Sequence, residues 1–388
     1  MILRLLITAI LLSFSICATG AELRIGLISR FKNQPIITVS ATAEFRIYDS
    51  SGAVLSTIPA AERVTLSVKD SKTILSRTDG SSGILDRLII IDCASNEGIL
   101  LLASNDCPIA EYHGKIEVKL NDDKLSCVNI VDLEDYVRGV LPSEMPSTFH
   151  LEALKAQAVA ARTYAWNSRG RHGKSGFDLC DSTDCQVYHG AAYEKPSTSE
   201  AVKQTAGQVL VYNGKLISAQ FCSDCGGITK SGGQAYLSSV VDRPAQGDCD
   251  YCEHKGHTWS KSWPVAEFEK ILAKTYSDLG GLKDISVTDT DETGRVTDLS
   301  IKADKGSRTI SGTRLRTMLG NTVIKSTIFS VKIEDGNVIF EGKGYGHGVG
   351  LCQWGANGMA SEPHNHTYDK ILKHYYTDVE IVDLSSVN

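Results

Sequence analysis

The chain has 388 residues, of which 42% are hydrophobic and 22% charged, and it contains 9 prolines. These proportions are typical of a globular protein large enough for two or three domains, and they exclude a low-complexity chain. The formal net charge is −6, and an acidic chain is a poor candidate for nucleic-acid binding, so we exclude that class.

The first 21 residues have the pattern of a secretory signal peptide, with Arg4 before an apolar stretch and small residues after it. The apolar stretch is shorter than the roughly 20 residues that a membrane span needs. We therefore expect an exported protein of the periplasm or cell envelope; the alternative is an uncleaved segment that anchors the chain. Cleavage would remove Arg4 and Cys17, which leaves a net charge of −7 and ten cysteines. An even number of cysteines outside the cytoplasm first suggests disulfides.

Residues 22–111 are expected to form a β-rich N-terminal region. Apolar and polar residues alternate there with the period of two that is typical of strands, and turns containing Gly or Asp separate the alternating segments. The alternation extends to about Lys124 and is clearest at Phe45 and Ile47, at Val64, Leu66 and Val68, and at Ile116, Val118 and Leu120. The residues of this region predict no function.

Two helices are predicted next. At residue 133 the apolar spacing changes to that of a helix, and Pro142 is expected to end it. An alanine-rich segment predicts a second, long helix over 151–170. A short loop that carries Glu144 is expected to connect the two.

The second half of the chain mixes loops, helices and strands. Residues 175–265 are rich in loops and contain six cysteines, and helices are predicted at 266–276 and 310–319. A hairpin is predicted over 329–343, with Asp335-Gly336 as its turn. Because helices and strands are interspersed without βαβ regularity, the predicted fold class is α+β, with mostly antiparallel sheet.

Glu144 is the first candidate for chemistry. It lies between Pro142 and Pro146, which stiffen the expected loop. A carboxyl group held in such a place is partly shielded from water, which raises its pKa and suits it to act as a general acid near neutral pH. From these residues alone, the alternative is an ordinary surface glutamate.

Cys180 and Cys185 form a second candidate site. They lie four residues apart in a loop, with His172 and His189 on either side. Two thiolates and an imidazole could hold a tetrahedral zinc ion and leave one position open. The exported context equally allows a disulfide, so the sequence leaves both interpretations open.

The second set of cysteines consists of two CxxC pairs separated by 23 residues. In an exported chain two crossed disulfides are slightly favoured, whereas a cytosolic chain with this spacing would suggest a structural zinc site. His254 and His257 are spare ligands if a metal is bound. The set consists of Cys222, Cys225, Cys249 and Cys252.

A glycine-rich stretch, KGYGHGVGLCQWG, spans residues 343–355. Its spacing does not match the dinucleotide fingerprint and no GK[ST] follows, which excludes a nucleotide-binding loop. The alternating glycines either let the backbone approach a ligand, with His347 and Gln353 as polar contacts, or serve tight packing.

Together these motifs resemble the stage II sporulation protein D family, which shares its domain with amidase-enhancer proteins. The resemblance rests on LPSEMP at 141–146, LKAQAVAARTYA at 154–165 and GHGVGLCQWGA at 346–356, in this order. It extends over about 112–376, which we expect to be the catalytic domain, and leaves 377–388 as a C-terminal tail.

The resemblance implies a peptidoglycan lytic transglycosylase, a carbon-oxygen lyase that cleaves the MurNAc–GlcNAc bond of glycan strands without stem peptides. Glu144 matches the family's catalytic glutamate and would act as general acid and base. One carboxyl group suffices, because the O6 of the muramic acid attacks C1 and forms a 1,6-anhydro end. The alternative is a non-catalytic glycan-binding activator of a cell-wall amidase. A zinc hydrolase is a remote third reading, because no HExxH motif is present.

The resemblance also implies contacts to the glycan. We expect Arg162 to bind the lactyl carboxylate of muramic acid, although a buried helix contact is an equal alternative. The other substrate-binding candidates are Gln186, Tyr188, His347 and Gln353.

Some members of the family hold zinc beside the glutamate, through two cysteines that match Cys180 and Cys185. The histidine expected six residues earlier is replaced by Lys174, so His172, two residues further back, is taken as the third ligand. Such an ion would shape the site, since glycosidic cleavage does not require it. The expected partners are peptidoglycan glycan strands and a cell-wall amidase.

Overall fold

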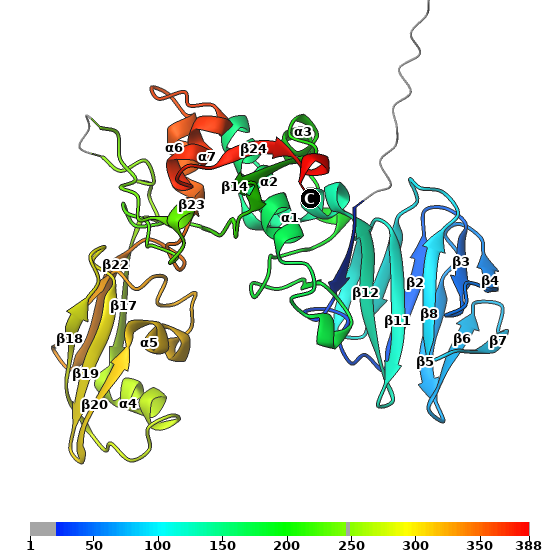
Figure 1. The fold of residues 1–388 in the computed structure, drawn as a ribbon. Helices are drawn as coiled ribbons and strands as arrows, with labels where there is room; N and C mark the ends of the chain where they lie inside the picture. Colours follow the sequence, from blue (N-terminus) through cyan, green and yellow to red (C-terminus); the bar gives the residue numbers. More distant parts are fainter. Residues whose placement is uncertain (1–20, 246–248, 388) are drawn as a thin grey trace, which may run out of the picture.

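The computed structural model describes residues 21–245 and 249–387. The export signal predicted at the N-terminus lies outside these residues, except for its last position. Figure 1 shows three parts in a row: a β-rich N-terminal part, a central helical part and a smaller lobe at the far end. The α+β prediction is confirmed. Among the described residues, no helix is both long and apolar enough to cross a bilayer.

The N-terminal part is built from two sheets whose strands are almost all antiparallel. Its alternating pattern is confirmed, since β12 buries every second side chain. A seven-stranded sheet has the order β13-β1-β12-β11-β8-β3-β4, and a six-stranded sheet has the order β10-β9-β2-β5-β6-β7. The strands are β1 (Glu22–Gly26), β2 (Ile36–Ala41), β3 (Phe45–Tyr48), β4 (Val54–Ile58), β5 (Val64–Lys69), β6 (Lys72–Arg77), β7 (Ser82–Leu85), β8 (Leu88–Cys93), β9 (Leu100–Ser104), β10 (Cys107–Tyr112), β11 (Lys115–Asn121), β12 (Lys124–Asp132) and β13 (Leu179–Cys180).

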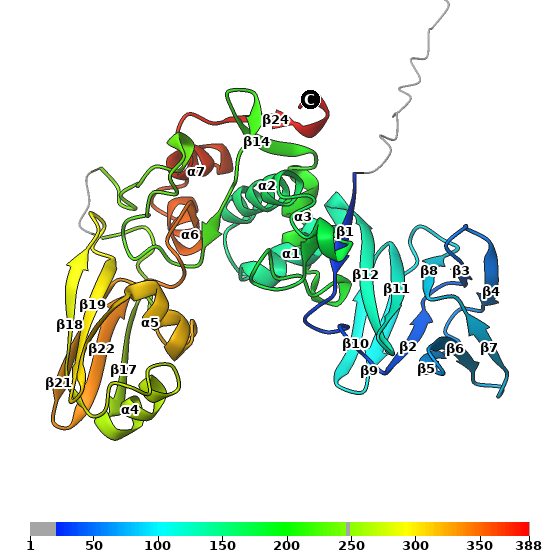
Figure 2. The same cartoon turned by 60° about the horizontal axis from the view of Figure 1, so that its bottom comes forward.

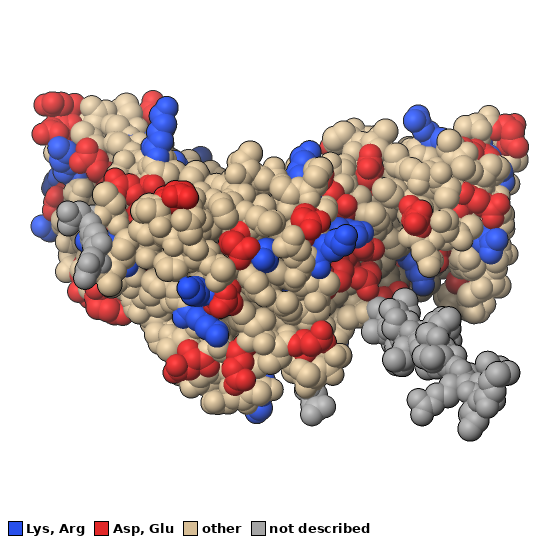
Figure 3. All heavy atoms as spheres, turned by 90° about the horizontal axis from the view of Figure 1, so that it is seen from above, with Lys and Arg blue, Asp and Glu red and all other residues tan. Residues whose placement is uncertain are grey.

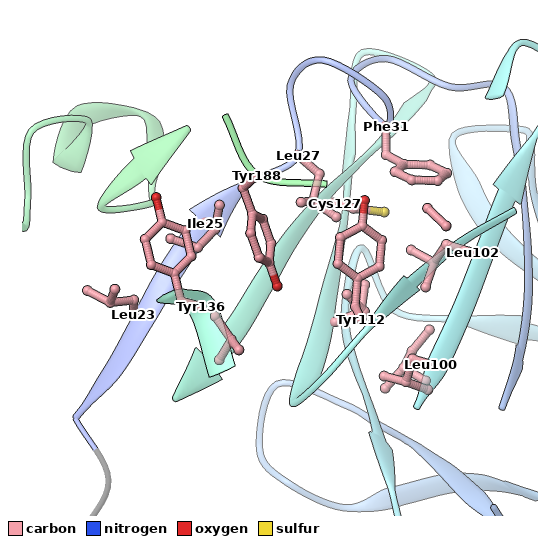
Figure 4. Close-up of a cluster of buried hydrophobic side chains, with 14 of the residues drawn as sticks. Leu23, Ile25, Leu27, Phe31, Leu100, Leu102, Tyr112, Cys127, Tyr136 and Tyr188 are labelled. Atoms are coloured by element: carbon pink, nitrogen blue, oxygen red, sulfur yellow. The ribbon is translucent and has the colours of Figure 1, made fainter. Parts of the chain in front are cut away.

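The seven-stranded sheet joins this part to the site. β11 pairs with β8 of the N-terminal region and with β12, which continues directly into the first helix. Residues 115–132, which belong to the segment predicted to be catalytic, therefore share a sheet with the N-terminal region. Figure 4 shows Tyr136, Tyr188 and Tyr112 in a row from the helical part to the sheet, and the ring centroids of neighbours are 5.0 and 6.0 Å apart.

The central part contains helices α1 (Leu133–Glu144), α2 (Leu151–Asn167) and α3 (Pro196–Gln204). The prediction that Pro142 ends the first helix is wrong. A proline so close to the C-terminus removes only one amide donor, and the N–H of Met145 still reaches the carbonyl of Leu141 at 3.0 Å.

The C-terminal helices complete the central part. Figure 2 shows α6 between the helices α1 and α2 and the small lobe. The elements are β14 (Gln208–Tyr212), β15 (Lys215–Leu216), β16 (Phe221–Cys222), β23 (Leu351–Cys352), α6 (Gln353–Ala360), α7 (Tyr368–Tyr375) and β24 (Glu380–Asp383), with short 3-10 turns η1 (Gly173–Ser175), η2 (Ala191–Tyr193), η3 (Ala235–Leu237) and η4 (Leu384–Ser386).

The smaller lobe has a hydrophobic core of its own, which includes Trp259, Phe268 and Phe340. Both of its connections lead to β16 and β23, which pair with each other in parallel. The predicted helices and the hairpin are confirmed. The elements are β17 (Thr258–Pro264), α4 (Val265–Ala273), β18 (Leu282–Thr290), β19 (Val296–Ala303), β20 (Gly306–Ser311), α5 (Gly312–Leu319), β21 (Phe329–Glu334) and β22 (Asn337–Lys343).

Candidate active site

Glu144 is the last residue of α1, and its half-buried side chain accepts a hydrogen bond from the N–H of Val187 at 2.5 Å. Burial raises the pKa of this carboxyl group to about 7, against the opposing effect of the Val187 hydrogen bond. The negative end of the α1 dipole acts in the same direction as burial, because it disfavours a second negative charge. A substantial fraction of Glu144, about half, is therefore protonated at pH 7, and the protonated form is the state that a general acid needs.

Two cavities meet at Glu144. One has a volume of about 740 Å³ and reaches the 183–185 loop and the small lobe. The other, of about 370 Å³, lies along 142–146. Glu144, Ser223 and Gln353 line both cavities. An extended ligand that filled both would therefore cross the carboxyl group.

The larger cavity contains one other carboxyl group among the described residues, that of Asp184. Its side chain is exposed, forms an ion pair with Arg171 at 3.1 Å, and lies 3.3 Å from Nε2 of His172. Glu144 is thus the carboxyl group of this cavity that is shielded from water, and its pKa is raised by that burial.

The glycine-rich stretch forms a wall of the larger cavity, and its glycines are required by packing. Gly350 has φ +74°, and a Cβ there would lie 1.9 Å from the carbonyl oxygen of Gln220. Gly344 has φ +80°, and a Cβ there would lie 2.9 Å from the backbone nitrogen of Gly226. Both conformations and both contacts exclude a side chain. The packing alternative, which the sequence left open, therefore accounts for these two glycines.

His347 and Gln353 both line the larger cavity. The ring of His347 accepts a hydrogen bond at Nδ1 from the N–H of Val349, at 3.0 Å. The side chain is partly exposed, but the burial of the rest of it lowers the pKa of the ring. The positive charges of Arg316 and Arg295 act in the same direction. Gln353 begins α6 and lies 3.5 Å from Gln157. Both predicted contacts thus lie where a ligand could meet them.

Arg162 does not reach the cleft, so its predicted role in substrate binding is wrong. Its side chain is fully buried in α2. Nε and Nη2 donate to the carboxylate of Glu134 at 2.7 and 2.6 Å, and Nη1 donates to the carbonyl of Gln208 at 3.2 Å. The buried helix contact, which was the alternative, is what the structure shows.

Gln186 and Tyr188 are also buried beneath the site, and their predicted contacts to substrate are wrong. Gln186 accepts from the hydroxyl of Tyr136 at 3.2 Å and donates to the carbonyl of Ala161 at 3.3 Å. The hydroxyl of Tyr188 donates to Asn129 at 2.8 Å. These anchors flank Val187, so they fix the N–H that bonds to Glu144.

The structure brings His172, Cys180 and Cys185 together and adds Asp184, which the sequence analysis missed. One ligand atom of each lies within 4.8 Å of the others, and Nε2 of His172 is 3.2 Å from the Cys185 sulfur. Cys180 and Cys185 are not bridged. The group does not include His189, whose ring packs on Tyr193. Two sulfurs, an imidazole and a carboxylate form a donor set that suits zinc.

In the second set of cysteines, the sulfurs of Cys225 and Cys252 lie 3.7 Å apart and are not bridged. The expected arrangement of crossed disulfides is therefore wrong for Cys225 and Cys252. Cys249 is exposed and lies outside the group of close sulfurs, and Cys352 of the glycine-rich stretch takes its place.

Arg316 is one of two arginines that line the larger cavity and that the sequence analysis missed; the other, Arg171, pairs with Asp184. Arg316 lies on α5 of the small lobe and donates to the carbonyl oxygens of Ile324 at 2.8 Å and Asn321 at 3.2 Å. The RLRTMLG motif at 314–320 was the feature of the sequence that could have indicated this arginine. Spacing alone does not show which of its two arginines faces the cavity. Figure 3 shows Lys and Arg scattered among Asp and Glu over one face of the molecule, whereas two arginines, Arg171 and Arg316, line the larger cavity.

Comparison with known proteins agrees with this division of the chain. Residues 121–212, which carry α1, α2 and the metal-ligand group, match a family model described as "Stage II sporulation protein". Residues 230–350, which include the small lobe, match one described as a domain of unknown function (DUF8618).

Three relatives cover most of the chain. An uncharacterized protein of Brachyspira hyodysenteriae is 37% identical over 281 residues, which is 72% of this chain and 74% of that protein. The amidase enhancer of Bacillus subtilis is 34% identical over 285 residues, 62% of this chain and 39% of that protein. Stage II sporulation protein D of Bacillus subtilis is 34% identical over 274 residues, 66% of this chain and 75% of that protein. The chain therefore belongs to the stage II sporulation protein D family.

Proposed function

We propose that this protein is an exported lytic transglycosylase that cleaves peptidoglycan glycan strands without stem peptides. The observation that carries the proposal is Glu144, a carboxyl group with a pKa of about 7 at the point where two cavities meet. A relative named amidase enhancer and others named for sporulation support a role at the cell wall.

In the mechanism that this geometry supports, protonated Glu144 donates its proton to the glycosidic oxygen between MurNAc and GlcNAc. Positive charge develops at C1 of the muramic acid as the bond breaks. The O6 hydroxyl of the same sugar attacks C1 and loses its proton to the Glu144 carboxylate, which restores the acid and leaves a 1,6-anhydro end. The N–H of Val187 stabilises the carboxylate between the two proton transfers.

Arg316 supplies the positive charge that an anionic strand needs, in place of Arg162. We expect Arg316→Ala to weaken binding of peptide-free strands roughly tenfold to a hundredfold, because a charged hydrogen bond contributes about 1.5–3 kcal/mol. The Kd is measured by fluorescence anisotropy with labelled strands. Arg308→Ala, an exposed change on the same lobe, serves as control.

Strands whose lactyl carboxylate has been reduced to an alcohol test the assignment directly. Wild-type protein should bind them as weakly as the Arg316→Ala variant binds native strands. Equal binding of native and reduced strands by wild-type protein would contradict the role of Arg316.

The pH dependence of cleavage should follow the raised pKa of Glu144. A general acid must be protonated in the free enzyme, so kcat/KM is expected to be level at low pH and to fall about tenfold per pH unit above about 7. Initial rates at fixed ionic strength between pH 5 and 9 give the profile. A midpoint near 4.5, the ordinary value for glutamic acid, would show that the carboxyl group is not shielded.

We further propose that His172, Cys180 and Cys185 hold zinc, with Asp184 beside them. The donor set and the 3.2 Å approach of His172 to Cys185 support this. A zinc ion there would fix the loop that leads to Val187 and so hold its N–H against Glu144. The acid chemistry itself remains with Glu144.

Product analysis tests the proposed function. Purified strands without stem peptides are incubated with the protein, and mass spectrometry identifies the new ends. Ends in 1,6-anhydro-MurNAc are expected, whereas ordinary reducing ends would indicate hydrolysis by water. Strand binding without any cleavage would favour a glycan-binding activator of a cell-wall amidase, the second candidate that the amidase-enhancer relative suggests.

A further inference from the structure

A second group of buried metal-ligating side chains lies next to the cleft. It consists of Cys225, Cys252, Cys352 and Asp224, and one ligand atom of each lies within 4.8 Å of the other three. The three cysteines are fully buried and Asp224 is 2% exposed. The neighbouring Cys222 is 4% exposed. The residues come from three segments far apart in the sequence, so no local turn explains why they meet.

The sulfur of Cys352 is surrounded by donors that favour a thiolate. The N–H groups of Cys225 and Gly355 lie 3.1 and 3.3 Å from it, and Cys352 is the N-cap of α6. Amide donors and the positive end of a helix stabilise a negatively charged sulfur. A neutral thiol or a disulfide sulfur, which accepts hydrogen bonds only weakly, would use these donors poorly.

The group also concentrates acidic side chains away from water. Asp224 lies with Oδ2 3.0 Å from Nδ1 of His257. A second carboxylate, that of fully buried Asp242, lies 3.1 Å from the Cys225 sulfur and accepts a hydrogen bond from the hydroxyl of Tyr375 at 2.6 Å. Thiolates and carboxylates so close together in a dry interior require a compensating cation.

We propose that Cys225, Cys252 and Cys352 bind a zinc ion through their thiolates, with Asp224 as the fourth ligand. Three sulfurs and one oxygen form a closed tetrahedral set, which is typical of a structural rather than a catalytic zinc site. On binding, each thiol loses its proton to solvent and the ion takes its place. His257 holds the Asp224 carboxylate in position from outside the ligand set.

The ion would connect three segments, two of which line the cleft. It joins the turn after β16, the loop that enters the small lobe, and the glycine-rich stretch that leaves it. Ser223 and Gln353, which border Glu144 in both cavities, are close neighbours of these ligands in the sequence. The ion would hold the segments that connect the small lobe against the central helices. This structural role does not depend on the proposed cleavage reaction.

Metal counting in single variants tests the inference. The full chain is purified without oxygen or chelators. The number of zinc ions per chain is then measured by inductively coupled plasma mass spectrometry. Wild-type protein and Cys249→Ser, an exposed control, are expected to hold two zinc ions. Cys352→Ser is expected to hold one. Cys185→Ser, which removes a ligand at the cleft, is also expected to hold one.

The remaining ion identifies the site. X-ray absorption of the Cys185→Ser protein is expected to show zinc with three sulfur neighbours and one lighter neighbour, and this measurement stands even if Cys352→Ser fails to fold. Two or fewer sulfur neighbours would overturn the inference. A disulfide between Cys225 and Cys252 in unreduced peptide maps, or an unchanged zinc content in folded Cys352→Ser, would also overturn it.

Discussion

Replacement of Glu144 by glutamine is expected to lower the rate of strand cleavage by about 10²- to 10⁴-fold, the usual contribution of general acid catalysis. Glutamine keeps the size of the side chain, and its carbonyl oxygen can still accept from the N–H of Val187. It has no proton to give to the glycosidic oxygen. Single-turnover rates, counted as new 1,6-anhydro ends, measure the loss, and strand affinity should stay within about threefold of wild type.

Two controls separate this loss from damage to the fold. Glu200→Gln makes the same chemical change on the exposed face of α3 and should leave the rate unchanged. Stability should change in the opposite direction to activity. The pKa of Glu144 rises from 4.5 to about 7 on folding, so the folded state loses stability as the pH rises from about 4.5 to about 7, the loss is fully present at pH 8, and below pH 4.5 both states are protonated.

The glutamine variant should therefore unfold at higher urea than wild type at pH 8 and at the same urea at pH 4. Full activity of Glu144→Gln would remove the carboxyl group from the mechanism. A variant that is inactive and also less stable at pH 8 would instead point to a structural role for Glu144.

The second large effect is expected at Arg162. Arg162→Met should lower the free energy of unfolding by about 1.5–3 kcal/mol, the usual contribution of hydrogen bonds to charged groups, because the arginine is fully buried whereas the Glu134 side chain is 31% exposed. The change leaves the Glu134 carboxylate with the N–H of Gly207, 3.1 Å away, and leaves the carbonyl of Gln208 without its arginine donor. Native-state hydrogen exchange of the α2 amides measures the loss where it occurs, without assuming that the whole chain unfolds in one step.

Arg138→Met is the matched control. It removes a partly exposed ion pair with Asp135 from the same helix that carries Glu134, and should cost less than about 1 kcal/mol. Replacing Glu134 and Arg162 together by Leu and Met should restore much of the stability, because no carboxylate is then left without its arginine. If the Arg162→Met protein kept wild-type stability but bound strands weakly, Arg162 would have a role in substrate binding and not in stability.

The sequence was sufficient where local patterns decide the structure. The strand alternation, the helices of the small lobe and its hairpin depend on neighbours within a few residues, and all are present in the structure. Pro142 was misjudged because the cost of a proline depends on how far it lies from the helix end. For Glu144, flanking prolines indicated shielding, but only the folded chain shows the hydrogen bond from Val187.

The site residues that sequence reasoning misplaced share a physical cause. Arg162, Gln186 and Tyr188 belong to the motifs of the family, but a motif records residues that support a site as well as those that touch a ligand. Whether a polar side chain points to the cleft or to a buried partner depends on contacts with distant segments. For Arg162 the partner is Glu134, 28 residues earlier in the chain. The same holds for Cys352, whose sulfur meets those of Cys225 and Cys252 only after the small lobe has been inserted between them.

The insertion of the small lobe between β16 and β23 separates two tasks along the gene. Under the proposed function, the acid that breaks the bond is encoded before the lobe and the arginine that selects the anionic strand is encoded within it. Natural variation in the lobe can therefore change which cell-wall polymers are accepted, while the catalytic helix stays under constant selection. Recombination at the two adjoining strands would exchange substrate preference as a single cassette.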